Sequence, residues 1–400
     1  MAMPHLLRRW MKNRLSLGNP RKKTAPRNKT RLLLEALENR VVPATNITIL
    51  ATANGTGTLD AILSPVNGTI TTADDPGDPA ATLSRGALEN VGPGVTISIT
   101  ADNTISFNDL GALNLQTGGG INAGFVANTG PVSFANVANT VITAGGSISF
   151  SAGTDLTVSN LNSNGGNVNL TAGTAGAGNL TFENILTSGS GNLTFQATNA
   201  AGGMITQGGS PSVASGQVIT ANATGNVTVD GLRGTTVSLA SNIGSVNSAG
   251  SNTVQASTQL AVSAATGITL NTLAASLTAK NNPSGDINIT QAASPAQTLA
   301  ITGAGVVNNA ASGAINLTNL GADITIAGGA TVKSNAGNVT LAATGFTLNG
   351  AVNSGVAATA LANSIPGFQF DLGTKTPGKI GLTATELNNV TAGVLRIGSA

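Results

Sequence analysis

Apolar and polar residues alternate in short runs along most of this chain, and glycines separate the runs. From about residue 145 onward the runs read GGSISF, GGNVNL, GNLTF, GDINIT and GNVTL. Each run places an apolar, a polar and another apolar residue after its turn, as in Ile148 and Phe150 or Val168 and Leu170. A period of two puts both apolar side chains on one face of a strand. The pattern therefore predicts a series of half-buried β-strands.

The apolar runs recur at intervals of about 20 residues, and this period decides between three β architectures. A sandwich domain spans about 100 residues around large core side chains, and propeller blades of about 40–50 residues carry aromatic signatures. This chain has only 2% aromatic residues. Coils of about 20 residues are typical of a parallel β-helix. We therefore predict an all-β fold, a single-stranded parallel β-helix (β-solenoid). It is expected to be irregular over residues 45–144, with a loop insertion at 71–80, and regular over 145–400.

The first 44 residues follow a different pattern. Residues 1–30 are rich in Arg and Lys, and Pro20 and Pro26 interrupt any helix there, which predicts a disordered basic arm. Residues 31–42 place four apolar side chains on one helical face, and Pro43 ends the run. We therefore expect the solenoid to be preceded by a disordered arm and one short helix.

Charge divides the chain at the same place. Residues 1–44 hold eleven Lys or Arg and two Glu, a net charge of +9, whereas residues 45–400 hold seven Lys or Arg and fourteen Asp or Glu, a net charge of −7. Charged residues make up 8% of the chain, against about 25% in an ordinary soluble domain. In stacked coils equivalent residues lie about 4.8 Å apart. Like charges would repel at that distance, whereas Asn, Thr and Ser side chains can hydrogen-bond along the stack.

The segment RLLLEALENRVVPA, residues 31–44, resembles the LEPR-XLL-type sorting motif near the N-terminus of large surface or secreted proteins of planctomycete-type bacteria. Asn39 departs from that motif. The resemblance implies export or surface sorting through an unconventional leader, and Val42 and Ala44 suit cleavage by a signal peptidase after Ala44. The alternative is a helix that caps the first coil. The residues that match the motif are Arg31, Leu33, Glu35, Leu37, Glu38, Arg40, Pro43 and Ala44.

The body of the chain carries a second resemblance. Residues 83–109 and the later GNVTL-type repeats resemble the β-helices of filamentous haemagglutinins and autotransporter passengers. That resemblance implies an extracellular role in adhesion. In such exoproteins a segment like residues 391–400 leads into another coil, so the possibility that this chain is part of a longer product stays open.

Candidate catalytic and metal-binding residues are few. The chain has no Cys, and His5, its single histidine, lies in the basic arm, so a Ser-His-Asp triad or a His-based metal site on the solenoid is excluded. β-Helix enzymes that act on polysaccharides use clustered carboxylates, but the carboxylates of the body are dispersed in sequence. The dispersed carboxylates include Asp155, Glu183, Asp230, Asp286 and Asp323.

One dense acidic cluster lies in the loop insertion. Asp74, Asp75 and Asp78 offer the oxygen ligands that Ca²⁺ prefers, although their spacing matches no EF-hand loop. We favour a solvated loop over a calcium site, and we expect no cofactor.

We expect an exported bacterial protein, secreted or held at the cell surface, that acts as an adhesin or a structural matrix or stalk protein and is not an enzyme. Its partners would be the export machinery, through residues 1–44, and glycans or proteins of a host, a matrix or a neighbouring cell. We expect no nucleic-acid partner, because no nucleic-acid-binding module follows the arm. No transmembrane segment is expected either. The alternatives are a polysaccharide-processing enzyme and a passive stalk of a longer multidomain exoprotein.

Overall fold

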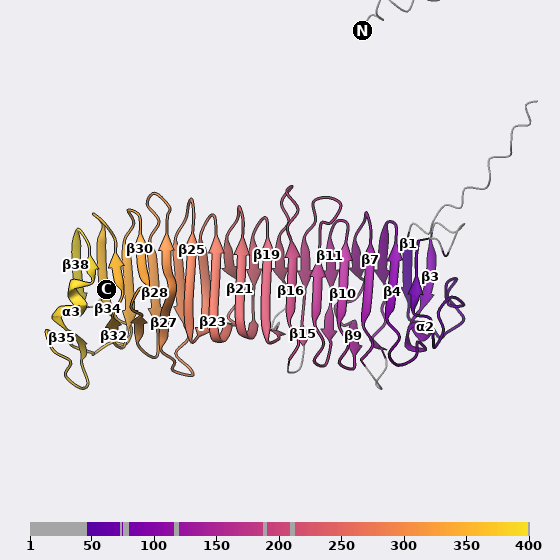
Figure 1. The fold of residues 1–400 in the computed structure, drawn as a ribbon, viewed down its shortest axis with the longest axis horizontal. Helices are drawn as coiled ribbons and strands as arrows, with labels where there is room; N and C mark the ends of the chain where they lie inside the picture. The colour runs from indigo at the N-terminus through magenta and orange to yellow at the C-terminus, as the bar shows by residue number, and fades with distance from the viewer. Residues whose placement is uncertain are drawn as a thin grey trace, which may run out of the picture. The chain divides into compact units, whose positions relative to one another are not determined.

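The computed structural model describes the part of the chain that follows the basic arm, and this part is a parallel β-solenoid (Figure 1). The arm and the helix predicted for residues 31–42 lie outside the described residues. Contacts divide the chain into two units, residues 1–40 and 41–400, and only the second is described below. The described residues are 46–72, 74, 80–115, 120–186, 190–208 and 213–398.

Most coils contribute one strand to each of three parallel sheets, which we call sheets I, II and III in the order in which each coil meets them from residue 97 onward. The strands of sheet I are β2 (Thr69–Ile70), β4 (Ile97–Ala101), β7 (Ala123–Ala127), β10 (Ile148–Ala152), β13 (Val168–Thr171), β16 (Leu193–Ala197), β19 (Val218–Ala223), the second parts of β21 (Leu232–Ser241) and β23 (Val254–Ala264), β25 (Ser276–Asn281), the second part of β27 (Leu299–Asn308), β30 (Thr331–Ser334), β33 (Ala351–Asn353) and β37 (Val390–Thr391).

Sheet II lies beside sheet I along the whole stack. Its strands, in spatial order, are β3 (Ala81–Ser84), β1 (Asn46–Leu50), β5 (Thr104–Phe107), β8 (Val132–Phe134), β11 (Leu156–Val158), β14 (Leu180–Phe182), β17 (Ile205–Gln207), β20 (Val227–Val229), β22 (Val246–Ser248), the first part of β24 (Ile268–Ala274), β26 (Ile287–Gln291), β28 (Ile315–Asn319), β31 (Val339–Ala343), β34 (Ala358–Asn363) and β38 (Val394–Gly398).

Sheet III is the shortest of the three and is completed by the first parts of the long strands. Its strands are β6 (Ala112–Leu115), β9 (Thr140–Thr143), β12 (Asn160–Asn162), β15 (Ile185–Leu186), β18 (Ala214–Ser215), the first parts of β21 and β23, the junction of β24 and β25, the first part of β27, β29 (Ile324–Ile326) and β32 (Phe346–Leu348).

The predicted alternation determines which side chains form the core. The anchors Ile148 and Phe150 pair with Val168 and Leu170 of the next coil, and all four side chains are fully buried. The predicted coil length of about 20 residues holds for this pair, but other coils are longer because loops extend their corners. Ala279, for example, pairs with Val306, 27 residues later.

The phenylalanines are few but concentrated inside the stack. Phe107 stacks on Phe134 with ring centroids 4.3 Å apart, and Phe125 stacks on Phe150 at 5.0 Å. Edge-to-face contacts join these two pairs into one cluster. Aromatic pairs in these geometries add about 0.5–1.5 kcal/mol each beyond the area that they bury.

Asparagine and aspartate side chains connect the outer corners of successive coils. The side-chain oxygen of Asn167 accepts a hydrogen bond from the backbone N–H of Asn192 at 2.9 Å, and the side chain of Asn192 accepts one from Val218 N–H at 3.1 Å. Direct pairs also occur, as between Asn316 and Asn288 at 2.7 Å. The expected polar ladders are therefore present, and many of their rungs join a side chain to the backbone of the next coil.

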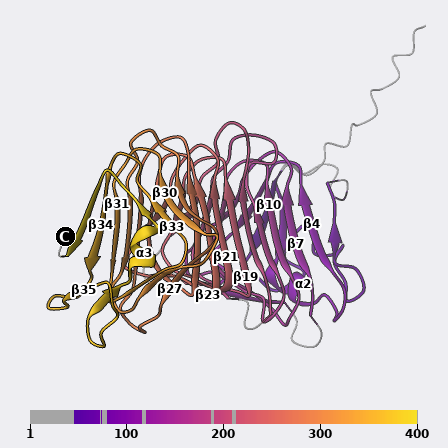
Figure 2. The same cartoon turned by 60° about the vertical axis from the view of Figure 1, so that its left-hand side comes forward.

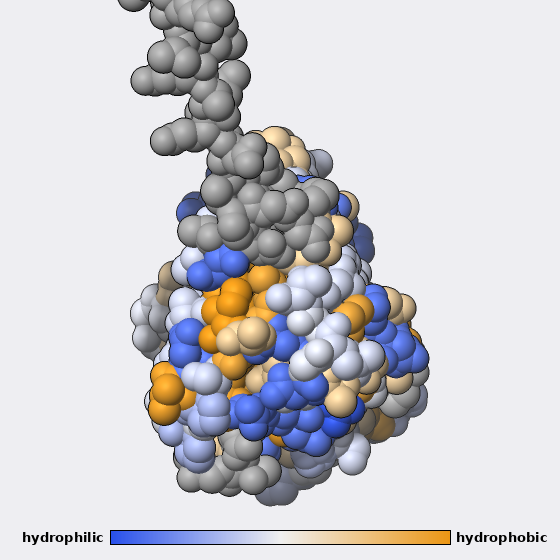
Figure 3. Space-filling model, turned by 90° about the vertical axis from the view of Figure 1, so that its right-hand side faces the viewer, coloured by the Kyte–Doolittle hydropathy of each residue, from blue (hydrophilic) through white to orange (hydrophobic). Residues whose placement is uncertain are grey.

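The N-terminal end of sheet II is closed by the chain itself. β3 lies outside β1, although it follows β1 in sequence, so the first coil folds back over its own start. The backbone N–H of Leu59 donates to Thr82 O at 3.0 Å, and Thr58 and Thr82 exchange hydrogen bonds through their hydroxyl groups. Helix α2 (Arg85–Glu89), which the sequence pattern did not predict, buries Leu88 against this end. Figure 3 faces it and shows apolar side chains exposed among polar ones.

Asp60 holds this N-terminal cap together. Its carboxylate is 4% exposed and accepts backbone N–H groups from Gly55, Gly57 and Ser84 at 2.7–2.9 Å. The Ser84 hydroxyl donates a further bond at 2.6 Å, and the same hydroxyl caps α2. Burial by itself raises the pKa of Asp60, but these bonds outweigh it and hold the pKa below its ordinary value of 3.8.

Candidate functional site

The C-terminal end of the described chain carries an insertion that interrupts the coil pattern. After β34, residues 364–383 leave the stack and form a small parallel pair, β35 (Phe370–Leu372) and β36 (Ile380–Leu382), before helix α3 (Ala384–Asn388) leads into β37. Figure 2 shows α3 and β35 at this end of the stack. The sequence pattern did not predict α3, because a five-residue helix is too short for a 3.6-residue period to show.

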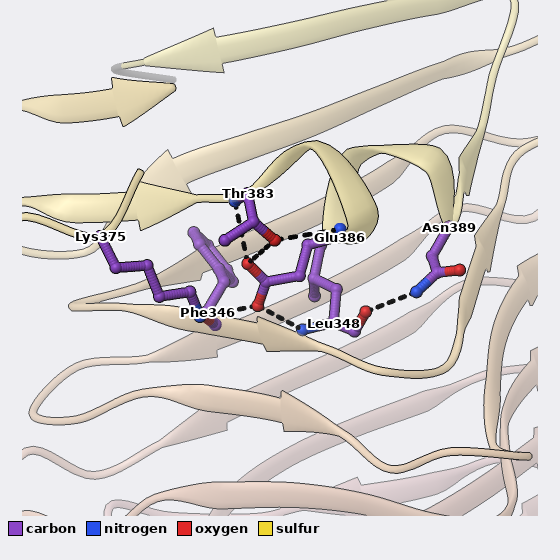
Figure 4. Close-up of polar contacts among 6 residues, drawn as sticks. All are labelled: Phe346, Leu348, Lys375, Thr383, Glu386 and Asn389. Carbon is purple, nitrogen blue, oxygen red and sulfur yellow. Dashed lines mark hydrogen bonds and ion pairs between the residues drawn. The ribbon is translucent and has the colours of Figure 1, made fainter. Parts of the chain in front are cut away.

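Glu386 of α3 fixes this insertion to the end of sheet III (Figure 4). Its carboxylate is 6% exposed. Oε1 accepts Lys375 Nζ at 2.7 Å and the backbone N–H of Leu348 at 3.2 Å, and Oε2 accepts both the backbone N–H and the hydroxyl of Thr383 at 2.9–3.0 Å. Since β32 is the last strand of sheet III, these bonds replace the partner strand that its edge lacks.

Two further contacts complete that cap. Lys375 Nζ donates to Phe346 O at 3.1 Å, and the side chain of Asn389 donates to Leu348 O at 2.7 Å (Figure 4). Burial raises the pKa of Glu386, but the bonds from Lys375, Thr383 and Leu348 outweigh it and hold the pKa below its ordinary value of 4.5. The carboxylate is therefore ionised at neutral pH, and its ion pair with Lys375 is half-exposed on the lysine side.

Asp371 orders the loop between β35 and β36. It accepts hydrogen bonds from the hydroxyl groups of Thr374, at 2.6 Å, and Thr376, and from the backbone N–H of Thr376 at 3.1 Å. The bonds from these two threonines hold the pKa of Asp371 below its ordinary value, and the charge of Lys379 contributes in the same direction. These hydrogen bonds therefore order the loop that carries Lys375 and Lys379.

An open groove of about 650 Å³ lies between this insertion and the corner that precedes sheet III. On the coil side Asp323, Thr344 and Thr347 line it, and on the insertion side Ile365, Phe368 and Lys379 do so. The Thr344 hydroxyl donates to Asp323 Oδ1 at 2.8 Å. Gly345 permits this arrangement, because a Cβ there would lie 2.5 Å from Asp323 Oδ1. We call this concavity the C-terminal groove.

A second concavity, of about 320 Å³, lies on sheet I. Val262 and Ala279 contribute to its floor, and Lys280 stands at its edge. It forms where strand register shifts, between Leu277 and Ala279 in the pairing of β25 with β27. This depression is mostly apolar, so it offers few directional contacts to a ligand.

The five carboxylates singled out in the sequence lie next to five different strands: Asp155 at β11, Glu183 at β14, Asp230 at β20, Asp286 at β26 and Asp323 at β29. Asp155 and Asp286 each accept a backbone N–H of the next coil, from Asn179 at 2.7 Å and from Ala314 at 2.8 Å. Asp230 is buried beside Asn252, whose amide donates to it at 2.8 Å. Asp323 is the one of the five that lines the C-terminal groove. Among the described residues, no group of three or more His, Cys, Asp or Glu is placed to hold a metal ion.

Asp74 turns back on its own loop, where its carboxylate accepts the backbone N–H and the hydroxyl of Thr71 at 2.6 and 2.8 Å. Asp75 and Asp78 lie outside the described residues, so the calcium-loop hypothesis rests on the sequence alone. All eight residues that match the sorting motif also lie outside the described ranges.

Sequence reasoning missed the residues that close the two ends, Asp60 and Glu386. A signal for Glu386 was present, because Thr383 and Glu386 stand at the spacing of a capping box, Ser/Thr-x-x-Glu, and both of its reciprocal bonds form. Asp60 has no such signal, since its partners come from two separate segments.

These features define the class of protein: a three-sheeted parallel β-solenoid with a closed N-terminal edge in sheet II and a groove beside its C-terminal insertion. Comparison with protein-family models, with curated proteins and with solved structures finds no match. Among the described residues, no helix is long and apolar enough to cross a membrane.

Proposed function

We propose that this chain is an exported bacterial β-solenoid that acts outside the cell or on its surface as an adhesin or a structural stalk. The observation that carries the proposal is the repeated outer surface of the stack. Hydrogen-bonded Asn and Asp residues recur from coil to coil at its corners, as at Asn167, Asn192 and Asn226. A surface that repeats about every 4.8 Å offers many equivalent weak contacts.

Such contacts support adhesion through summation rather than through one strong site. Once one contact forms, the next ones form at a high effective concentration, so total affinity exceeds any single affinity. A rigid framework favours this mechanism, because its contacting groups are already ordered before binding. The partners proposed are glycans or proteins on a host, a matrix or a neighbouring cell.

The leader completes the proposal. Residues 1–44 carry a net charge of +9 and the motif-like segment 31–44. Basic residues next to an anionic membrane contribute about 1 kcal/mol each, and the motif would be read by the export machinery. The described solenoid, which starts at Asn46, is the cargo in this proposal.

The test compares the full chain with residues 45–400, both produced in a bacterium whose own proteins carry the sorting motif. Surface protease treatment of intact cells measures exposure, and circular dichroism of the purified proteins measures folding. We expect the shortened chain to stay inside the cell with an unchanged β spectrum. A matched control keeps the arm and replaces only Arg31, Glu35 and Arg40 by Ala, and it should be retained as well. Surface exposure of the shortened chain would refute the leader role, and loss of its β spectrum would support the alternative that residues 31–44 cap the first coil.

A further inference from the structure

We propose that the C-terminal groove is a binding site for a neutral hexopyranose unit of a polysaccharide. This inference goes beyond the proposed function, because adhesion through the repeated faces of the solenoid needs no single site. It rests on the side chains that line the groove and on the way the insertion is held in place.

The first observation is an exposed aromatic ring. Phe368 is 39% exposed, whereas Phe107, Phe125, Phe150, Phe182 and Phe195 are all fully buried. Ile365 is 38% exposed beside it on the same wall of the groove. The face of an aromatic ring carries partial negative charge and attracts C–H groups, and a pyranose presents such groups on one side of its ring. Phe368 and Ile365 thus form an apolar wall suited to one face of a sugar.

The second observation is the opposite wall, which is polar. The groove is lined there by the carboxylate of Asp323 and by the hydroxyl groups of Thr344 and Thr347. Thr344 occupies Oδ1 of Asp323, which leaves Oδ2 to accept a hydrogen bond from a sugar hydroxyl. Lys379, also on the groove wall, is placed to donate to a sugar oxygen. A sugar ring between the two walls would therefore meet apolar atoms on one face and hydrogen-bonding groups at its edge.

The charge of the groove selects a neutral ligand. Lys375 is paired with Glu386 at 2.7 Å, and the charge of Lys379 is partly offset by Asp371, whose pKa it helps to lower. Asp323 is the carboxylate that lines the groove itself. A uronate or a phosphate group would gain from Lys379 but would face the like charge of Asp323. Hydroxyl groups can use both side chains, because a hydroxyl donates to a carboxylate and accepts from an ammonium group.

The groove is also preorganised. Asp371 holds the loop through Thr374 and Thr376, the Lys375–Glu386 pair ties it to α3, and β35 pairs with β36. Phe368 precedes β35 by only two residues, so little conformational freedom remains to be lost when a ligand binds. The volume of about 650 Å³ lies within the range of small-molecule sites, about 300–1,000 Å³.

The test uses the full 400-residue chain and ligand-observed NMR titrations. The neutral probes are trisaccharides of glucose, mannose and galactose, and the acidic probe is trigalacturonate. Each probe is titrated to about 10 mM, a concentration at which weak binding to a single site is detectable. We expect saturable binding of at least one neutral probe and at least tenfold weaker binding of trigalacturonate. Phe368→Ala and Asp323→Asn should each weaken neutral binding at least tenfold, and Val66→Ala, at an exposed apolar position in the N-terminal segment, should leave it unchanged.

Three results would overturn the proposal: no binding of any neutral probe, tighter binding of trigalacturonate, or undiminished binding by Phe368→Ala. Phe368 is exposed, so its replacement should leave the fold intact, and an unchanged circular dichroism spectrum verifies this. Surface exposure of the Phe368→Ala chain on intact cells should equal that of the unmodified chain. The saccharide site and the export proposal therefore succeed or fail independently.

Discussion

Two buried carboxylates stand out at the scale of single residues, because in a chain with 8% charged residues each of them closes one end of a sheet. Asp60 satisfies backbone N–H groups around β3, and Glu386 satisfies one at the edge of β32. A buried N–H without a partner costs about 1–3 kcal/mol. At these two positions a buried charge therefore satisfies backbone groups where the sheet has no further neighbouring strand.

The cap made by Glu386 should depend on pH. Its folded-state pKa lies below the ordinary value of 4.5, so the carboxylate contributes its full stability above about pH 5. That contribution is lost as the pH falls from about 4.5 through the lowered pKa. We expect Glu386→Gln to destabilise the cap by about 2 kcal/mol at pH 7 and to remove most of this acid dependence.

Hydrogen exchange at residues 346–348 between pH 3.5 and 7, corrected for the intrinsic rate, measures this effect. Asp109→Asn is the matched control, because Asp109 is exposed. Equal acid sensitivity of the Glu386→Gln and unmodified chains would show that another group controls this end.

At the scale of the strand, the stability of each strand should depend mainly on the two strands that it pairs with. Leu170 is fully buried and pairs with Phe150 on one side and Phe195 on the other. Leu170→Asp places a carboxylate in this narrow core and should cost several kcal/mol, unless the group takes up a proton. Because stability in a stacked array is mainly a nearest-neighbour property, the damage should stay within a few coils.

Limited proteolysis followed by mass spectrometry locates that damage. We expect new cleavage near residues 145–200 and protection of residues 260–345. Asn169→Asp is the control, since Asn169 is exposed on the other face of the same strand. Simultaneous cleavage along the whole stack would contradict the nearest-neighbour description.

Strands of this kind were predictable from sequence because their alternation has a period of two and recurs. The same alternation places Gln291 and Asn308 on the inner face after apolar anchors, yet they are polar and fully buried. Gln291 pairs with the backbone of Ala274, and Asn308 with the side chain of Asn281. The period of the alternation predicts which face these two side chains lie on. It does not predict their hydrogen-bond partners, which lie 17 and 27 residues away in the sequence.

The C-terminal groove was beyond prediction for a related reason. Asp323 and Phe368 lie 45 residues apart and meet only because the insertion folds back along the stack. Residues 364–383 fall within the range expected to be regular, although their composition, with two phenylalanines and two lysines, differs from that of the repeats.

At the scale of the whole solenoid, the two ends of sheet II differ. β3 is covered by residues 58–60. β38 pairs with β34 on one side, and its Val394 and Leu395 are 52% and 40% exposed. Leu395 lies in register with the fully buried Thr359, so it points toward the end of the core.

Amide hydrogen exchange should therefore show a gradient along the described stack. We expect β38 to exchange at least about 100-fold faster than β10 and β13, each of which has a neighbour on both sides. Peptide-resolved hydrogen exchange of the full chain measures this. Uniform protection from β10 to β38 would mean that a further contact covers the β38 edge.

The closed edge of β3 also limits how copies of this chain can polymerise. A fibre that grows by strand addition needs two complementary open edges on every copy, one to receive and one to be received. In sheet II β38 supplies one such edge, but Thr58 and Asp60 already occupy the other. A strand offered to the β3 edge would first have to displace Thr58, Leu59 and Asp60. Freeing this edge would require the bonds of Thr58 and Leu59 to Thr82 to break together with those of Asp60 to Ser84, so residues 58–60 jointly protect this end of the stack from strand addition.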